Sequence, residues 1–313
     1  MLQGTDTIRP HQPPLKRHLA ATRPAFLLLA LVAVGIGLAT SHTTGLALDP
    51  VWAALTLLGA VALHAAANVH NDYADDVNGS DAANHDRQSP FTGGSRMIQA
   101  GAMTRRETRQ FARWLYAMTI AIGTILLIPG GWPLLILGLG GLLIAWAYSG
   151  PPLSLNAKGG GEIAVGIGFG ILIPLGADIV QRGAFHAMPL AAGTGFALIT
   201  ASLLLINQFP DVRADRLAGK HHWVVRLGPR RARHVFLITT TAAYLTPIIL
   251  VAAGLLPVTA LAVFAALPLS AIAAHDLWRH YATPGRLRRA LASTVAATLL
   301  HGSLLIAGLV FAA

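Results

Sequence analysis

Long runs of uncharged, mostly apolar residues dominate the chain, and short polar or basic segments separate them. A helix that crosses a bilayer needs about 20 consecutive apolar residues. The runs 114–157 and 235–275 are each long enough for two such helices, and Pro and Gly residues at 129–133 and near 254–257 supply the breaks. The pattern predicts nine transmembrane helices, over residues 24–47, 50–72, 111–129, 132–149, 162–181, 184–209, 233–254, 257–277 and 290–312.

These helices predict a single all-α transmembrane domain over residues 23–313, preceded by a cytoplasmic N-terminal tail over residues 1–22. The first apolar run follows a polar, proline-rich stretch and has no clear small-residue cleavage site, which favours a helix over a removed signal peptide. Glycines at every second position, Gly166, Gly168 and Gly170, predict close packing between helices.

The basic residues follow the predicted topology. With nine helices, all Lys and Arg residues except Arg182 fall in the N-terminal segment before the first helix, in the loops after the second, fourth, sixth and eighth helices, or at the helix ends that adjoin these loops. Cytoplasmic loops carry an excess of Lys and Arg, so we expect a multi-pass protein of the inner (plasma) membrane with its N-terminus in the cytoplasm. The net charge of +10 is then a topology signal, and nucleic acid is not an expected partner.

Composition supports the membrane interpretation. Charged residues make up 12% of the chain, about half of the roughly 25% found in soluble domains. Apolar residues make up 54%, which excludes a disordered chain. The absence of Cys from the sequence excludes disulfides, thiolate metal sites and Cys nucleophiles.

Two acidic clusters lie at the predicted inner ends of the second and sixth helices, in segments 68–81 and 207–220. Their polar residues recur three, four, seven or eight positions apart, which places each set on one helix face. An offset of 139 relates the two clusters, which suggests two parallel halves whose sites face each other. The related residues are Asn68, Asp72 and Asp76 in the first cluster and Asn207, Asp211 and Asp215 in the second.

Carboxylates gathered on one face near the C-terminus of a helix oppose the helix macrodipole and repel one another. A single acid in such a place, such as Glu107 or Asp276, needs no more than a capping or boundary role. The two clusters instead indicate that cations neutralise them. Hard oxygen ligands favour Mg²⁺ or Ca²⁺, and Mg²⁺ typically combines one or two carboxylates with substrate phosphates. The pattern predicts a diphosphate with an apolar tail, held between metal ions.

The motifs resemble those of a known family. The first cluster reads Asn71-Asp72-x-x-Asp75-x-x-x-Gly79-x-Asp81 and the second Asp211-x-x-x-Asp215-x-x-x-Gly219-Lys220. Both resemble the signature motifs of the UbiA superfamily of intramembrane prenyltransferases, and the resemblance covers about residues 20–310. Further segments resemble family landmarks in the same order, namely Thr22-Arg23-Pro24-Ala25-Phe26, the segment Ser95 to Gly101, Tyr148-Ser149-Gly150-Pro151-Pro152, Gly161-Glu162 and Val225-Arg226-Leu227-Gly228.

Within the superfamily, the Gly79-x-Asp81 ending and the Arg96-x-x-Gln99-x-Gly101 pattern resemble the menaquinone branch, whose members prenylate 1,4-dihydroxy-2-naphthoate. One departure is Pro210, which stands where that branch more often has Arg. The resemblance implies nine helices around a central cavity, Mg²⁺ as cofactor and a polyprenyl diphosphate as donor. It also implies that an electron-rich ring carbon attacks an allylic cation; with the naphthoate as acceptor, the carboxylate would be lost as CO₂ and the product would be a demethylmenaquinone.

The resemblance also implies roles for individual residues. The expected catalytic carboxylates are Asp72, Asp75, Asp211 and Asp215. The expected metal ligands are these four together with Asn68 and Asp76. The residues expected to bind substrate are Asn68, Asn71, Asp81, Arg87, Arg96, Tyr148, Asn207 and Lys220. The internal repeat selects Asp76, whereas the family pattern selects Asp75 and Asp81, and the sequence leaves this register open. We interpret His64 and His70 as buried histidines bonded to neighbours rather than as catalytic bases.

Two alternatives stay open at this point. The acceptor is 1,4-dihydroxy-2-naphthoate or another molecule, such as 4-hydroxybenzoate, homogentisate, a tetrapyrrole or a glycerol phosphate. A cation-coupled transporter also uses acids and repeats, but places them near helix centres. The acids here lie at helix ends beside a basic loop, which favours an enzyme that binds a prenyl donor, a small aromatic acceptor and membrane lipid, with no protein partner.

Overall fold

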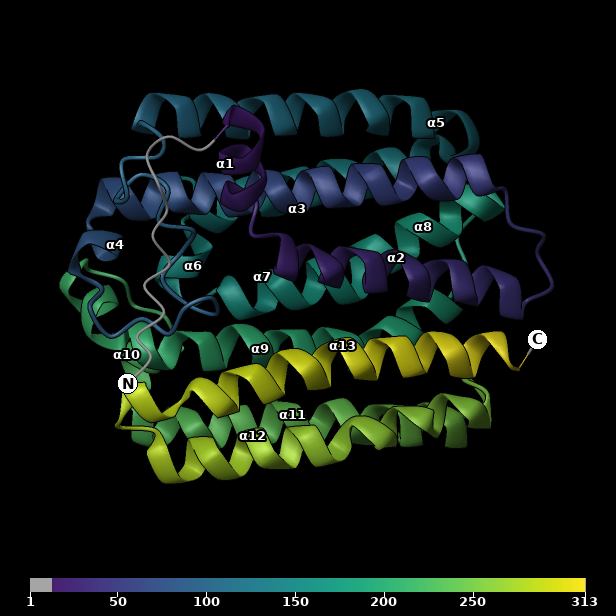
Figure 1. Cartoon of the computed structure of the whole chain (residues 1–313). Coiled ribbons are helices and arrows are strands. Elements are labelled where there is room, and N and C mark those ends of the chain that lie inside the picture. Colours follow the sequence, from purple (N-terminus) through teal and green to yellow (C-terminus); the bar gives the residue numbers. More distant parts are fainter. Residues whose placement is uncertain (1–12, 313) are drawn as a thin grey trace.

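The computed structural model of the chain describes residues 13–312, and in that range its secondary structure is entirely helical. The predicted tail before residue 13, with Arg9, lies outside the described residues, as does residue 313. The long helices run side by side along the bundle (Figure 1). Eight helices of the described range are long and apolar enough to cross a membrane: α2 (Pro24–Thr43), α3 (Pro50–Asn78), α5 (Arg105–Ser149), α7–η1–α8 (Gly161–Arg182), α9 (Met188–Leu217), α11 (Pro229–Ala252), η2–α12 (Val258–His280) and α13 (Arg288–Val310).

Helix α5 accounts for the difference between nine predicted helices and eight observed ones. Its Gly131 has non-helical torsion angles, φ 56° and ψ −155°. The Tyr116 hydroxyl lies 3.4 Å from Nδ1 of His70 in α3. Ser149 donates a hydrogen bond to the side chain of Asn71, which directly follows His70 (3.1 Å). A straight helix would separate Tyr116 from Ser149 by about 50 Å, so the chain reverses at Gly131. The helices predicted at 111–129 and 132–149 are the two arms of α5, and the all-α transmembrane fold is confirmed.

Short helices gather at one end of the bundle: α4 (Ser80–Ala83), α6 (Leu155–Lys158) and α10 (Trp223–Leu227) (Figure 1). Helix α3 ends there because Gly79 adopts the left-handed conformation (φ 84°) that glycine tolerates. Asn78 then accepts a hydrogen bond from the backbone N–H of Ser80 (2.9 Å), which starts α4. This turn directs the chain from the acidic end of α3 toward α9.

The sequence did not predict α1 (Pro14–Ala21), which lies in the segment interpreted as a tail. Two of its apolar residues, Leu15 and Leu19, are exposed, while Ala21 is buried against α3 and α5 residues. Helix α1 is therefore attached to the bundle by its C-terminal end.

Glycine allows α9 to approach the α7–η1–α8 helix closely. A Cβ atom on Gly193 of α9 would lie 1.6 Å from the carbonyl oxygen of Gly170, and one on Gly170 would lie 2.5 Å from the backbone of Ala197. A Cβ on Gly166 would lie 3.1 Å from the carbonyl oxygen of Ala197, whereas one on Gly168 would meet nothing within 4 Å. Close packing is thus confirmed for Gly166 and Gly170 and not for Gly168.

We expect Gly193→Ala to destabilise the protein. The added methyl group collides with a backbone carbonyl that no rotamer change can move, and overpacking of this kind costs about 1–3 kcal/mol or more. The melting temperature of the purified protein in detergent should fall by several degrees. The matched control is Gly168→Ala in the facing helix, which should melt within about one degree of the parent because the added methyl meets open space. Equal melting temperatures for the two variants would contradict the packing described here.

Candidate active site

The structure brings the two acidic clusters together at the end of the bundle where α4, α6 and α10 lie (Figure 1). The Lys220 ammonium group lies 2.8 Å from a carboxylate oxygen of Asp75 and 2.9 Å from one of Asp215. A single cation therefore joins α3 to the end of α9. Burial lowers the pKa of Lys220, but the carboxylates of Asp75 and Asp215 outweigh burial and raise the pKa above its usual value.

A polar cavity opens between these helix ends and the loop that follows α4. Seven of its lining residues come from the two acidic clusters and were expected to act in the site: Asn71, Asp75, Asp81, Asn207, Asp211, Asp215 and Lys220. Their side chains come from α3, α4, α9 and the turn after α9. The sequence analysis predicted these residues because each belongs to one of the two acidic clusters.

The loop after α4 forms hydrogen bonds to two carboxylates, of which Asp211 lines the polar cavity and Asp72 lies behind its wall. Ser95 donates hydrogen bonds to Asp72 from its backbone N–H (3.2 Å) and from its hydroxyl group. Asn84 and Thr92 donate to Asp211, at 2.8 and 2.9 Å. The loop therefore orients both acids, one from each cluster.

Gly94 lets this loop approach the acids. Its φ of 68° lies in the left-handed region, and an added Cβ would lie 2.8 Å from an oxygen of Asp72 and 3.2 Å from one of Asp81. Asn84, Thr92 and Gly94 were missed by the sequence analysis. The adjacent pair Gly93-Gly94 just before Ser95 was the signal for a tight loop, but only tertiary structure shows which acids it meets.

Asp76 lies apart from the other acids. Its carboxylate accepts a hydrogen bond from Gln99 (3.0 Å) and pairs with Arg105. One helical residue corresponds to a rotation of about 100°, so Asp76 points away when Asp75 points toward Lys220. The equivalence of Asp76 and Asp215 suggested by the sequence repeat is not reproduced in space, where Asp75 meets Lys220 and Asp215.

Two predicted basic residues lie behind the cavity wall. Arg96 donates a hydrogen bond to the backbone carbonyl of Asp81 and has a positive φ of 63°. The Arg87 side chain packs against Gly93. Neither side chain lines the polar cavity in the described structure, so both support the loop in this conformation.

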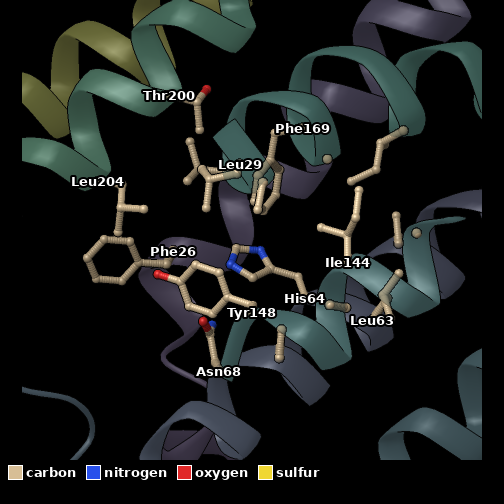
Figure 2. A pocket seen from close by; sticks show the side chains of 18 of the residues that line it. Phe26, Leu29, Leu63, His64, Asn68, Ile144, Tyr148, Phe169, Thr200 and Leu204 are labelled. Atoms are coloured by element: carbon tan, nitrogen blue, oxygen red, sulfur yellow. The ribbon is translucent and has the colours of Figure 1, made fainter. Parts of the chain in front are cut away.

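A second, apolar cavity adjoins the polar one (Figure 2). Its walls come mainly from α2, α3, the second arm of α5, the α7–η1–α8 helix and α9, and include the labelled side chains Phe26, Leu29, Leu63, Ile144, Phe169 and Leu204. Arg23, Asn71, Tyr148, Leu204 and Asn207 line both cavities and form their border. Asn68 lines the apolar cavity and donates a hydrogen bond to the carbonyl of Thr22 (2.9 Å).

Arg23 and His222 are further residues that the sequence analysis did not select. Arg23 lies over the Phe26 ring (4.5 Å to the ring centre) and donates to the carbonyl of Phe91 (3.1 Å), which fixes its guanidinium group at the border. His222 lies 3.0 Å from Asp215 and caps α10. His222 comes after the turn that ends α9, so helical spacing from the second motif could not find it.

The polar cavity has the donor atoms that a hard divalent cation and a phosphate need. Four buried oxygens of its lining have no hydrogen-bond partner in the described structure: Asp81 Oδ2, Asn84 Oδ1, Asn207 Oδ1 and Gln208 Oε1. Burial raises the pKa of Asp81 to about 8, and the charges of Asp75 and Asp72 act in the same direction. A cation beside these oxygens would give them a partner and would lower the pKa of Asp81.

Protein side chains alone do not complete a metal cage here. Among the described residues, no three or more His, Cys, Asp or Glu side chains are close enough to hold one ion together. Mg²⁺ usually keeps several waters and binds through one or two carboxylates plus substrate phosphates. The residues present therefore fit a magnesium ion that arrives with a diphosphate, and not a preformed all-protein site.

Comparisons with known proteins agree with this arrangement. The model of the UbiA prenyltransferase family matches residues 26–295. The 1,4-dihydroxy-2-naphthoate octaprenyltransferase of Escherichia coli (strain K12) is 32% identical over 222 residues, which cover 69% of this chain and 70% of that protein. The apo structure of a UbiA homolog from Aeropyrum pernix K1 has a TM-score of 0.63 at 21% identity, covering 90% of this chain and 97% of that one. A UbiA homolog from Archaeoglobus fulgidus bound to DMAPP and Mg²⁺ has a TM-score of 0.59 at 16% identity, covering 93% and 99%.

Proposed function

The chain belongs to the UbiA prenyltransferase family and is an integral membrane prenyltransferase, and from that premise we propose that it transfers a polyprenyl group from its diphosphate to 1,4-dihydroxy-2-naphthoate. The observation that carries the proposal is the shared border of the two cavities. A polar cavity rich in oxygen ligands and cations suits a diphosphate, and the adjoining apolar cavity suits the prenyl chain. The acceptor is supported by the name of the Escherichia coli relative.

The residues divide the work between the two cavities. Asp72, Asp75, Asp211 and Asp215 are the acids that would hold Mg²⁺, with Asp81 beside them. Bound Mg²⁺ would neutralise the diphosphate oxygens as negative charge develops on the leaving group. The Lys220 ammonium group, between two of these acids, lies where it adds positive charge to the same oxygens.

The border residues act on the other substrate atoms. The Tyr148 ring lines both cavities, so it lies beside the carbon that loses the diphosphate, where its face stabilises positive charge. The apolar walls keep water from that carbon. The guanidinium group of Arg23 at the same border can pair with the carboxylate of the acceptor or with a phosphate oxygen.

The orientation is part of the proposal. The acidic clusters, the basic loop after α4 and the turn containing Lys220 all lie at one end of the bundle. Arg182 lies at the opposite end, bonded to Thr44 after α2. The basic end is cytoplasmic by the positive-inside rule, which places the site on the cytoplasmic side of the plasma membrane.

The proposal predicts Mg²⁺-dependent transfer with a defined acceptor. Protein purified in detergent is incubated with radiolabelled farnesyl diphosphate, Mg²⁺ and, separately, 1,4-dihydroxy-2-naphthoate, 4-hydroxybenzoate, homogentisate and glycerol phosphate. We expect label in a decarboxylated naphthalene product, and a rate at least about tenfold lower in EDTA that returns on adding Mg²⁺. Transfer to another acceptor of the panel would overturn the naphthoate assignment, and equal rates with and without EDTA would overturn the role of Mg²⁺.

A further inference from the structure

His64 presents an imidazole to the apolar cavity from the face of α3 that carries the site residues. It lies one turn before Asn68 and two turns before Asn71 and Asp72, so these side chains share one face of the helix. Eight residues of helix place His64 about 12 Å from Asp72 along the axis. The imidazole is thus on the prenyl side of the border, beyond the diphosphate.

The surroundings of His64 are aromatic and apolar. The Phe169 ring contacts the imidazole edge-on, with 4.7 Å between ring centres. Phe26 and Tyr148 line the same cavity as His64 and Phe169 (Figure 2). Flat side chains on several sides suit a flat aromatic guest.

One nitrogen of this imidazole is buried without a partner. Nδ1 of His64 has no hydrogen bond in the described structure, which differs from the expectation that it pairs with a neighbour. His70, six residues further along α3, instead lies within reach of the Tyr116 hydroxyl (3.4 Å). A buried polar group without a partner lowers stability, and a prenyl chain offers it no donor or acceptor. A ring hydroxyl group offers both.

We propose that His64 binds the aromatic acceptor, with its imidazole in a hydrogen bond to a ring hydroxyl group, and this rests on the proposed function. As the ring carbon that bears the carboxylate bonds to the allylic carbon, the C–O bond to the diphosphate breaks and its electron pair leaves with the diphosphate. The ring recovers neutrality when its carboxylate departs as CO₂. The hydroxyl oxygen becomes more positive during this step, so its hydrogen bond to nitrogen is stronger in the transition state than in the ground state. The hydroxyl group keeps its proton throughout.

Kinetics of two His64 variants test this role, with farnesyl diphosphate and 1,4-dihydroxy-2-naphthoate as substrates of the full chain in detergent. We expect His64→Leu to raise the KM for the naphthoate at least about tenfold, to lower kcat as well because the hydrogen bond strengthens in the transition state, and to leave the KM for farnesyl diphosphate within about twofold. His64→Gln, whose amide can still pair with a hydroxyl group, should keep the naphthoate KM within about threefold. Where His64→Leu aggregates, His64→Met replaces it.

A second readout separates binding from a structural role. The two monohydroxy acceptors, 1-hydroxy-2-naphthoate and 4-hydroxy-2-naphthoate, each lack one hydroxyl group. One of these two hydroxyl groups is the one that His64 binds. Removing it from the acceptor should lower kcat/KM in both proteins, but the fold-loss in the parent should be at least about five times the fold-loss in His64→Leu. A structural defect in His64→Leu would lower kcat/KM equally for all acceptors, so the fold-loss on removing a hydroxyl group would be the same in the variant and in the parent.

The matched control is His70→Leu, on the same helix but directed at Tyr116 outside both cavities, which should leave the naphthoate KM unchanged. A naphthoate KM within twofold of the parent in His64→Leu, or an equal rise of both KM values in the Leu and Gln variants, would overturn the inference alone. A parent protein that prenylates no aromatic acceptor would overturn the proposed function instead.

Discussion

Asp75→Asn should lower turnover at least about a hundredfold, a barrier change of about 2.7 kcal/mol, whereas Asp76→Asn should stay within about threefold of the parent. The two acids are adjacent on α3 and the chemical change is identical, but they face different surroundings. Asp75 lines the polar cavity, accepts a hydrogen bond from Asn71 (2.9 Å) and pairs with Lys220. Asp76 pairs with Arg105, whose side chain is 62% exposed, so that ion pair contributes little.

Turnover is measured at saturating farnesyl diphosphate, naphthoate and Mg²⁺, so that a weaker ground-state affinity does not hide the effect on kcat. Melting temperatures of both variants should lie within a few degrees of the parent, which would separate lost chemistry from lost fold. A larger loss in Asp76→Asn than in Asp75→Asn would restore the register implied by the sequence repeat and would reject the placement of Asp75 at the diphosphate.

This register shows why helical periodicity predicts the site only in part. Spacing of three and four residues identifies the face of α3 that carries Asp72 and Asp75, but a face about 100° wide cannot exclude a neighbour such as Asp76. What excludes it is a salt bridge to Arg105, 29 residues away in sequence. In the second motif the predicted register is the observed one, since Asp211 and Asp215 both line the cavity.

The helices themselves were predictable because a membrane demands length and apolarity, and both can be read along the chain. The break at Gly131 was also predictable, since Pro and Gly interrupt the run there. Helix α1 was not, because its segment is polar and its packing depends on α3 and α5. Likewise, the loop from Asn84 to Ser95 has no periodic pattern, and its contacts with Asp72 and Asp211 arise only when the acidic ends of α3 and α9 reach the same end of the bundle.

Lys220→Met should lower both stability and turnover. Lys220 is 7% exposed and its ammonium group bridges Asp75 and Asp215, so its loss leaves two carboxylates close together in a poorly solvated place. Breaking a buried ion pair by removing one partner costs about 3–5 kcal/mol, and the melting temperature should fall by several degrees. The leaving diphosphate also loses a positive charge, and we expect kcat/KM for farnesyl diphosphate to fall at least about a hundredfold.

The double variant Asp75→Asn/Lys220→Met separates the two effects. Removing one carboxylate along with the ammonium group relieves the repulsion, so most of the lost stability should return while turnover stays low. Added Mg²⁺ should also raise the melting temperature of Lys220→Met more than that of the parent, because the ion supplies the missing charge. Lys158→Met is the matched control: its exposed ammonium group donates a hydrogen bond to the carbonyl of Pro152 at the same end of the bundle and pairs with no carboxylate of the described residues, so kcat/KM should stay within about threefold. A Lys220→Met protein that is as active as Lys158→Met would show that the diphosphate is bound without Lys220.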